Sequence, residues 1–420
     1  MGEQVDARTA AERLGVDVRT LYAYVSRGAL RRVPAPDGRS SRYDSDELEL
    51  LARRSRPRTL PRPAASIDLV IATRVSTVTD GVVRYRGRDV LALVAAGEPF
   101  EAVAERLWAG SPATESAWEF PAGEAASVRL VLGALSGAPV AMRFAAAVAA
   151  ATVAAATAVG GTAAGGLGTA GPPDWPAWGR FLIAAFVEAS GPAPGDAGGD
   201  GPVARRLWQR WSPLLPTAAR VRALNTALVL LAEHELAAST LAVRVAASAR
   251  AAPPGCVLAG LGTLSGTLHG DAPRIVRERL FRRPYGDSDS DGGDRRQAGA
   301  GAGLPPGVGF GHSVHRHGDP RAAPLLQAVY AIATPADRDL IERAGRGGAA
   351  RPNVDFALGA LSHVARMPPE AATAIFAVAR TAGWIAHAAE EYTEPYVRFR
   401  GRAVTAARRM RDRSDDKAHE

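Results

Sequence analysis

The chain has 420 residues, of which 47% are hydrophobic and only 6% are aromatic. A chain of this length can bury a large core in more than one domain, and its richness in Ala, Leu and Val favours helices. One cysteine, Cys256, excludes an intrachain disulfide, and the N-terminus shows no apolar signal core. A single cysteine suits a reducing cytoplasm, and no apolar run is long enough to span a bilayer, so we expect a cytoplasmic protein without membrane partners.

The formal net charge is +8 and the sequence pI is about 10.2. Such a balance is typical of proteins that bind nucleic acid or anionic ligands. Nearly all the basic residues are arginines, however, and this preference, with the excess of Ala, Gly and Pro, also fits a bias in the coding sequence. The placement of the arginines is therefore more informative than the total charge.

Residues 1–52 predict a small winged helix-turn-helix domain. A capping box at residues 9–12 opens a short helix, Gly15 makes a tight turn, and Asp17 caps a second helix over residues 18–27. A hairpin and the start of another helix follow, and the whole resembles the winged helix-turn-helix of MerR and excisionase proteins. The side chains expected to reach phosphates and base edges of DNA are Arg19, Thr20, Tyr22, Arg27, Arg39 and Arg42.

A small helical domain that contacts other proteins is the alternative interpretation of residues 1–52. Residues 53–66 alternate arginine with proline, which predicts an extended linker. Such a linker either follows a phosphate backbone or acts as a solvated spacer. The DNA-binding hypothesis therefore covers residues 1–62.

From residue 67 the pattern changes to strands and then to helices. Residues 67–80 are rich in β-branched side chains and end at an Asp-Gly turn, after which residues 82–89 continue the strands. Helices are expected at residues 90–95 and 100–108, and the remainder is Ala-rich, helical and broken by Gly and Pro. Segments rich in Gly, Ala, Pro or Asp predict loops at residues 160–173, 191–201 and 284–306.

The loop of residues 307–321 gathers glycines, histidines and arginines. Glycine lacks a Cβ, so the backbone of such a loop can approach a ligand closely. An arginine grips a carboxylate through two parallel charge-assisted hydrogen bonds, and a histidine can polarise a carbonyl oxygen. The loop alone would also fit a basic surface turn, so its meaning depends on the segments around it.

Two other segments supply that context. Leu-His269-Gly precedes the loop, and Asn-Val-Asp355 comes after it, followed by a helix over residues 373–391 that contains Arg380. In this order and at these distances, the segments resemble the active-site segments of the citrate synthase family. The resemblance runs from about residue 67 to about residue 402.

The resemblance implies a mainly α-helical fold with two domains. The large domain would span residues 67–273 and 369–405, and the small domain residues 274–368, with a charged tail at residues 406–420. The resemblance also implies an obligate homodimer and a cleft between the domains that closes when substrates bind.

The implied reaction is the condensation of an acyl-CoA with an α-keto acid, followed by hydrolysis of the thioester, with no metal and no cofactor apart from the CoA substrate. Asp355 would be the base that removes a methyl proton, and its apolar neighbours would raise the pKa of its carboxyl group. His269 would donate to the thioester oxygen, and His312 would polarise the keto carbonyl. The residues implied for the keto acid are His234, Arg321, Arg380 and Arg400, the last reaching across the dimer, and those implied for CoA are Gly309, Gly311 and Arg316.

The chain departs from the family pattern after His269. Asp271-Ala-Pro273 stands where the family has Gly or Leu followed by Ala-Asn. A carboxylate at Asp271 would raise the pKa of His269 and favour the charged form of the imidazole.

Three functions fit these residues. Acetyl-CoA with oxaloacetate, giving citrate, is the first, and propionyl-CoA, giving 2-methylcitrate, is the second. The third is a DNA-binding regulator whose synthase domain senses a metabolite with little turnover. The presence of His269, His312 and Asp355 favours an enzyme, whereas residues 1–62 favour the regulator.

Overall fold

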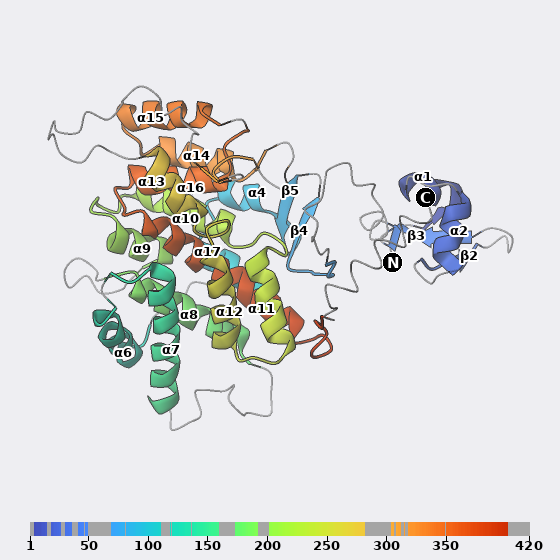
Figure 1. The fold of residues 1–420 in the computed structure, drawn as a ribbon, viewed down its shortest axis with the longest axis horizontal. Helices are drawn as coiled ribbons and strands as arrows, with labels where there is room; N and C mark the ends of the chain where they lie inside the picture. Colours follow the sequence, from blue (N-terminus) through green and yellow to red (C-terminus); the bar gives the residue numbers. More distant parts are fainter. Residues whose placement is uncertain are drawn as a thin grey trace, which may run out of the picture. The chain divides into compact units, whose positions relative to one another are not determined.

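The chain forms two compact units, Met1–Ile71 and Ala72–Glu420, in a computed structural model. Figure 1 labels most of the helices and strands of both units. The residues that the structure describes are 4–14, 18–26, 30–35, 41–45, 47–48, 69–79, 81–110, 118, 120–135, 137–158, 173–191, 201–281, 304–305, 308–311, 315, 318–348 and 350–401.

The first unit has a small apolar core. Its described elements are β1 (Gln4–Asp6), α1 (Ala7–Leu14), α2 (Val18–Ser26), β2 (Val33–Pro34) and β3 (Ser41–Asp44). The strands form an antiparallel sheet in the order β1-β3-β2. Buried side chains from the helices, the sheet and the segments next to them make up the core: Val5, Ala10, Ala11, Leu21, Leu30, Tyr43 and Leu48.

The first helix begins earlier than the sequence pattern predicts. Asp6 Oδ1 accepts a hydrogen bond from the backbone N–H of Thr9 at 2.8 Å, so Asp6, and not Thr9, caps α1. The predicted second helix matches α2, and β2 pairs with β3 as the predicted hairpin requires. Gly15, Asp17 and the turn of the hairpin lie outside the described residues.

The second unit opens with an antiparallel sheet and continues in helices, which confirms the predicted helical class. The sheet has the order β4-β5-β6 and lies in the segment where strands are expected. Its strands are β4 (Ser76–Thr79), β5 (Val82–Tyr85) and β6 (Arg88–Asp89). The helices that follow are α4 (Val90–Ala95), α5 (Phe100–Ala109), α6 (Ala122–Gly133), α7 (Val140–Ala158), α8 (Trp175–Ala189), α9 (Val203–Trp211), α10 (Ala218–Leu231), α11 (Ala238–Ser248) and α12 (Pro253–Leu264).

The Ala-rich stretch around residue 150 forms part of α7. Phe144, Ala147, Val148 and Ala151 are buried, so one face of this helix lies against the rest of the unit. Among the described residues, no helix is both long enough and apolar enough to cross a membrane.

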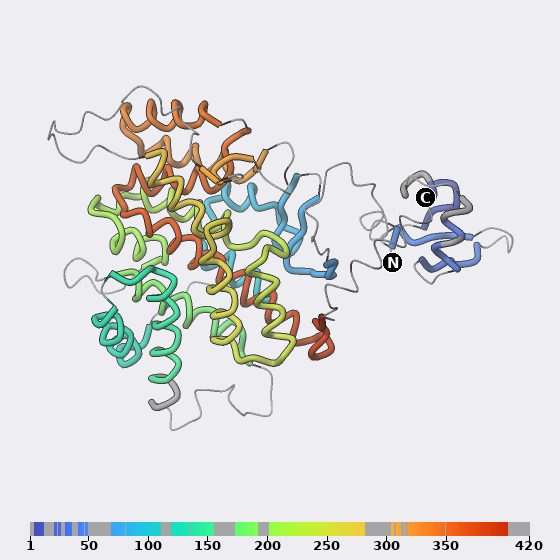
Figure 2. The backbone as a smooth tube through the Cα atoms, viewed as in Figure 1, coloured from blue at the N-terminus to red at the C-terminus, as the bar shows by residue number. Residues whose placement is uncertain are grey.

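Helix α17 (Glu370–Glu391) is the central element of the second unit. All residues from 371 to 388 are buried, and the helix packs against α5, α8, α10, α11, α12 and α13. Figure 2 shows its red trace running among the green and yellow traces of α8, α10, α11 and α12. A helix in such a position must be mainly apolar on every side, because no face remains in contact with water.

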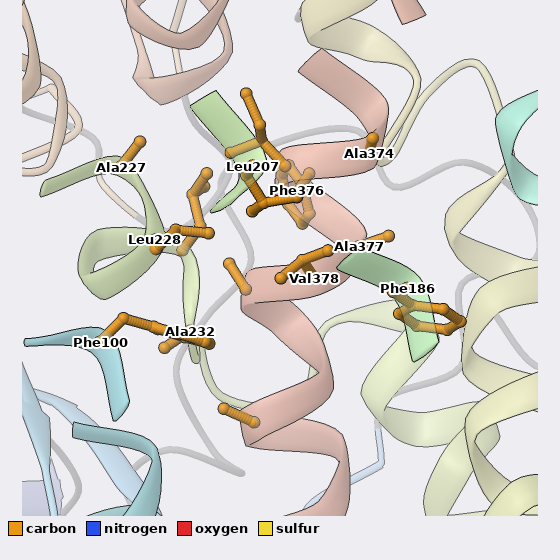
Figure 3. Close-up of a cluster of buried hydrophobic side chains, with 14 of the residues drawn as sticks. Phe100, Phe186, Leu207, Ala227, Leu228, Ala232, Ala374, Phe376, Ala377 and Val378 are labelled. Atoms are coloured by element: carbon orange, nitrogen blue, oxygen red, sulfur yellow. The ribbon is translucent and has the colours of Figure 1, made fainter. Parts of the chain in front are cut away.

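Apolar side chains from several helices meet on α17. Figure 3 shows Phe100 of α5, Phe186 of α8, Leu207 of α9 and Leu228 of α10 around Phe376 of α17. Each such side chain contributes roughly 1.5–3 kcal/mol when it is fully removed from water. This cluster therefore holds α17 at a defined position relative to the helices around it.

Four further helices comprise α16, which contains Asp355, and three helices packed against it. They are α13 (Ala272–Leu280), α14 (Ala322–Tyr330), α15 (Pro335–Arg346) and α16 (Val354–Val364). Helix α16 packs against α13, α14 and α15, and α13 also contacts α17. The four helices thus form a layer that contacts the central helix through α13 and α16.

Gly179 lets α8 pack directly against α5. A Cβ at position 179 would lie 2.5 Å from Cζ2 of Trp108. We predict that Gly179→Ala lowers the free energy of unfolding by about 1–3 kcal/mol, because the buried indole must shift. Thermal denaturation followed by circular dichroism measures this loss.

Gly133→Ala in α6 is the matched control, because a Cβ at position 133 meets no atom within 4 Å. This variant should keep the thermal midpoint of the parent or raise it slightly, since alanine restricts the unfolded chain. Equal losses in the two variants would contradict the direct packing of α8 on Trp108.

Candidate active site

An ion pair between Asp319 and Arg321 anchors the end of the loop of residues 307–321, called here the histidine-rich loop. Arg321 Nε and Nη2 donate to the two carboxylate oxygens of Asp319 at 2.9 and 3.0 Å, and both residues are buried. Asp319 Oδ2 also accepts the backbone N–H of Val354, the first residue of α16, at 3.0 Å. Burial by itself would raise the pKa of Asp319, but Arg321 outweighs this effect and holds the pKa at about 2. The pair stays ionised and joins the loop to α16.

Asn353 fastens the glycine segment of the same loop to α16. Its Oδ1 accepts the backbone N–H of Asp355 at 3.0 Å, and its Nδ2 donates to the carbonyl of Gly311 at 3.0 Å. The backbone N–H of Asn353 donates to the carbonyl of Gly309, also at 3.0 Å. Both glycines have positive φ values, 77° and 69°, which other residues adopt only with strain. The loop and the beginning of α16 therefore form one hydrogen-bonded unit.

These contacts place Asp355 in the first turn of α16. Burial raises the pKa of its carboxyl group to about 7, although the positive charges of Arg321 and Arg380 oppose the rise. The residue as a whole keeps some accessible surface. A carboxylate that titrates near neutral pH is a stronger base than an ordinary aspartate and is still partly ionised. The upward shift expected from the sequence is confirmed.

His269 lies in the turn between α12 and α13. Main-chain hydrogen bonds close the turn, among them one from the N–H of Gly270 to the carbonyl of Leu264 at 2.9 Å. His269 Nε2 lies 2.7 Å from the hydroxyl oxygen of Ser239. Burial, and secondly the positive charge of Arg380, lower the pKa of His269 to about 4, so the imidazole is neutral at pH 7.

The prediction that Asp271 favours a charged His269 is wrong. The carboxylate of Asp271 accepts hydrogen bonds from Arg274 Nε and Nη2 at 2.8 and 2.6 Å. Its Oδ1 also accepts the hydroxyl of Thr373 in α17 at 2.9 Å. The charge of Asp271 is therefore compensated within α13, and the pKa of His269 falls instead of rising.

Arg380 lies inside α17, one turn after Phe376. It is 1% exposed, its guanidinium group lies 4.9 Å from the centroid of the Phe376 ring, and its Nε donates to the carbonyl of Leu231 at 2.9 Å. His269 also contacts the Phe376 ring: it packs edge-on against it, with 5.9 Å between the ring centroids. Within the described residues, Nη1 of Arg380 is buried and has no hydrogen-bond partner. A buried donor without an acceptor is costly, so this atom indicates where an anion would bind.

His234 lies on the turn between α10 and α11, which β4 and α17 hold from two sides. Ser76 of β4 donates to Glu233 Oε1 at 3.1 Å, and His387 of α17 lies 3.1 Å from the same oxygen. His234 is 9% exposed, and its ring centroid is 5.1 Å from that of His315. The turn is thus fixed independently of any contact made by the imidazole of His234.

Four predicted site residues share one electrostatic neighbourhood. The charges of Arg321 and Arg380 both act on the carboxyl group of Asp355, and the charge of Arg380 acts on His269. The structure therefore brings together groups from four separate segments: a base near neutrality, a neutral imidazole and two buried cations.

Other predicted residues lie elsewhere or are not described. Arg400 is exposed on the C-terminal segment and is not buried with the other site arginines. Tyr22 and Arg42 are exposed in the first unit. The structure does not describe the side chains of Arg19 and Thr20. Four other predicted residues lie entirely outside the described residues: His312, Arg316, Arg27 and Arg39.

The motifs in the sequence predict no role for Asp319, Asn353, His315 or Ser239. Asp319, Asn353 and His315 lie inside the motif segments, and Ser239 follows His234 by five residues; these positions are their only signal in the sequence. Apart from the ion pair of Asp319 with Arg321, their partners are residues of other segments or backbone groups, which a linear pattern does not identify.

We predict that Asp355→Asn stabilises the protein at pH 8. The carboxyl group has a pKa of about 7 in the folded chain and an ordinary value of 3.8, so between these values the folded state holds a proton that the unfolded chain has lost. Stability therefore falls as pH rises through this window. Removing the charge should raise the free energy of unfolding at pH 8 by on the order of 3 kcal/mol, and by little at pH 4. Thermal melts at the two pH values measure the difference.

Asp337→Asn is the control with the opposite sign. Burial opposes the change, but hydrogen bonds from Thr334 and Arg366 lower the pKa of Asp337, so its carboxylate stabilises the fold above the unfolded pKa. This variant should lose stability at pH 8, and the loss should disappear as pH falls through the folded pKa. If Asp355→Asn also lost stability at pH 8, the raised pKa of Asp355 in the folded chain would be refuted.

Comparison with known proteins identifies relatives of the second unit. A family model described as citrate synthase, C-terminal domain, matches residues 68–400. Citrate synthases of Acidithiobacillus ferridurans and Synechocystis sp. are 33% and 34% identical over 193 and 195 residues, covering 43% and 42% of this chain and 49% and 46% of theirs. Citrate synthase 2 of Bacillus subtilis is 29% identical over 230 residues, covering 50% of this chain and 58% of that protein. The chain spans about half the length of the curated relatives it matches.

Solved structures have the same fold. The citrate synthase of Thermoplasma acidophilum, in a ternary complex with carboxymethyl coenzyme A and oxaloacetate, superposes with a TM-score of 0.61 at 22% identity, covering 80% of this chain and 94% of that chain. The citrate synthase of Pyrobaculum aerophilum gives a TM-score of 0.60 at 21% identity, covering 80% and 90%. Because the family model also matches well over half of the sequence, the chain belongs to the citrate synthase family and has its mainly helical fold.

Proposed function

We propose that the second unit condenses an acyl-CoA with oxaloacetate and then hydrolyses the thioester to release CoA. The observation that carries this proposal is the carboxyl group of Asp355, with its pKa of about 7, in the same electrostatic neighbourhood as His269 and two buried arginines. The methyl protons beside a thioester are very weakly acidic. Their removal therefore requires a base and, at the same time, a donor that stabilises the enolate oxygen.

The proposed roles follow from the chemistry of each group. Ionised Asp355 takes a proton from the acyl carbon, while neutral His269 donates a hydrogen bond to the thioester oxygen as charge develops there. The resulting nucleophilic carbon attacks the keto carbon of oxaloacetate, whose oxygen we assign to His312. Water then cleaves the thioester of the product, which releases the CoA thiol and a carboxylate.

Arg321 and Arg380 are assigned to the carboxylates of oxaloacetate. Both guanidinium groups are buried, and Arg380 has a donor without an acceptor among the described residues. A carboxylate of the substrate would supply that acceptor through a charge-assisted hydrogen bond. His234 is assigned to the same substrate, and Arg400 to the site of the second subunit in a homodimer.

Gly309, Gly311 and Arg316 are assigned to CoA. The Thermoplasma relative was solved with carboxymethyl coenzyme A and oxaloacetate, which supports this pair of substrates for the present chain. Acetyl-CoA is the first choice of acyl donor and propionyl-CoA the second. One methylene group in an apolar pocket changes discrimination by only about 1–3 kcal/mol, so an assay must distinguish the two donors.

The layer of α13–α16 is assigned to a small domain, residues 274–368. Residues 67–273 and 369–405 then form the large domain. Closure of the cleft between the domains would bring the groups of the site together and keep water from the enolate.

Purified protein should release free thiol from CoA only when oxaloacetate and an acyl-CoA are both present. Asp355→Asn should lower kcat by about 10²–10⁴-fold, because it removes the base that takes the proton. A thiol-reactive dye measures the release, and parallel assays with acetyl-CoA and propionyl-CoA identify the faster donor.

Asp174→Asn is the matched control, since Asp174 only caps α8 and asparagine caps a helix equally well. This variant should retain the kcat of the parent. If the folded protein binds oxaloacetate and yet releases no thiol with either donor, the proposed condensation activity is rejected. The second unit would then be a sensor of the metabolite.

We propose DNA binding by residues 1–62 as a second activity. Helices α1 and α2 follow one another directly, and β2 and β3 form an antiparallel pair. Tyr22 on α2 is 49% exposed, and Arg42 on β3 is also exposed. Aromatic and basic groups in such positions contact phosphates and base edges in DNA-binding domains.

Full-length protein should retard a pool of duplex DNA in a shift assay at low salt, and binding should weaken steeply as salt rises. Removal of residues 1–62 should abolish retardation and leave thiol release unchanged. Retardation that survives the truncation would place DNA binding in the second unit. Absence of retardation by the full-length protein at low salt would reject this activity.

A further inference from the structure

The end of α10 and the residue after it lie in register along one face of α17. Arg380 Nε donates to the carbonyl of Leu231 at 2.9 Å, and the backbone N–H of Gly383 donates to the carbonyl of Ala232 at 3.1 Å. A Cβ at position 383 would lie 2.6 Å from that carbonyl oxygen, so this approach requires glycine. Two consecutive residues are thus fixed on α17 directly before the turn that carries His234.

His387 extends this contact by one helical turn. Its Nε2 lies 3.1 Å from Oε1 of Glu233, the residue that immediately precedes His234, and its Nδ1 lies 2.7 Å from Nη1 of Arg244. The side chains of His387, Glu233 and Arg244 are fully buried. The imidazole therefore bridges a buried cation on α11 and a buried carboxylate beside the turn.

The proton of this imidazole has one possible position. A guanidinium group donates through its nitrogens and has no acceptor, so Nδ1 of His387 must accept from Arg244. Nδ1 then carries the lone pair, and the hydrogen of the neutral ring resides on Nε2, which donates it to Glu233. The bridge therefore has a defined direction, from Arg244 through His387 to Glu233.

Arg244 is itself held by two carboxylates of α17. Its Nε donates to Glu391 Oε2 at 2.9 Å, and its Nη1 donates to Glu390 Oε2 at 2.7 Å. Glu391 Oε1 also accepts from Nε of Arg398 at 2.6 Å, and Glu390 Oε1 accepts the backbone N–H of Arg74 at 2.8 Å. A guanidinium group with several buried partners is a fixed anchor for the imidazole that it contacts.

We propose that His387 is a positioning residue for the keto acid, because through Glu233 it fixes His234 in place relative to Arg380. His234 and Arg380 are both assigned to oxaloacetate, so this role rests on the proposed function. The attachment of the turn to α17 rests on the hydrogen bonds alone.

The charge of Glu233 also acts on Arg380. Burial lowers the pKa of Arg380, and among the charges that oppose this effect the carboxylate of Glu233 has the largest influence. A carboxylate held at this position keeps the buried guanidinium group in its charged form, which a carboxylate of the substrate requires. His387 thus holds the group that serves both His234 and Arg380.

The test compares two substitutions of His387 in the full-length protein. His387→Leu removes the bridge, whereas His387→Gln retains one acceptor for Arg244 and one donor for Glu233. Hydrogen exchange followed by mass spectrometry measures the opening of residues 232–237, and calorimetry measures the Kd for oxaloacetate. Both should rise about 10-fold in His387→Leu, because the turn loses a hydrogen bond to a carboxylate, and His387→Gln should restore both.

The kinetics of thiol release separate positioning from a general loss of structure. In His387→Leu the KM for oxaloacetate should rise, and the KM for the acyl-CoA should stay at the value of the parent. His387→Asn repeats the test with a polar side chain, because its amide ends one bond nearer the backbone than Nε2 of histidine. It should resemble His387→Leu.

His363→Leu is the matched control, because His363 is also a buried histidine beside a carboxylate, with Nε2 3.4 Å from Asp337 Oδ1. This variant should leave the exchange of residues 232–237 and the Kd for oxaloacetate unchanged. Exchange at the rate of the parent in folded His387→Leu would overturn the proposal, and so would faster exchange with an unchanged Kd. If the parent binds no oxaloacetate, the proposed function is rejected, and the exchange rates alone decide whether His387 holds the turn.

Discussion

The ion pair between Asp319 and Arg321 is the interaction on which the site depends. Its carboxylate also accepts the backbone N–H of Val354, so one side chain secures both the end of the histidine-rich loop and the start of α16. Loss of one partner of such a buried pair typically costs about 3–5 kcal/mol, because the other charge is left uncompensated. The geometry of the loop and the ionisation of the site are therefore coupled.

Arg321 of this pair also acts on the basicity of Asp355. Burial favours the protonated carboxyl group, whereas the charges of Arg321 and Arg380 favour the carboxylate, and the result is a pKa of about 7. Deeper burial without arginines would keep the group protonated at neutral pH. Greater exposure would return it to the pKa and the weak basicity of an ordinary aspartate. The arrangement of buried charges thus decides whether this carboxylate can take a proton from carbon.

Helix α17 connects these charges to the rest of the unit. Phe376, Arg380 and Trp384 follow one another at intervals of four residues, so they lie along one face of the helix. The first contacts His269, and the third contacts Ser239, which in turn lies beside His269. Because the helix is buried along most of its length, these side chains have little freedom to move relative to one another.

The sequence by itself determined the helical class, the order of the active-site segments and the residue types of the site, because motif spacing and apolar pattern are properties of the linear chain. It also indicated the helix around Arg380, which begins three residues earlier than predicted, at Glu370. Only the tertiary structure decided that Asp271 binds Arg274 and Thr373 instead of acting on His269. Neighbours in sequence need not face each other, whereas burial and hydrogen-bond partners depend on segments that meet only after folding.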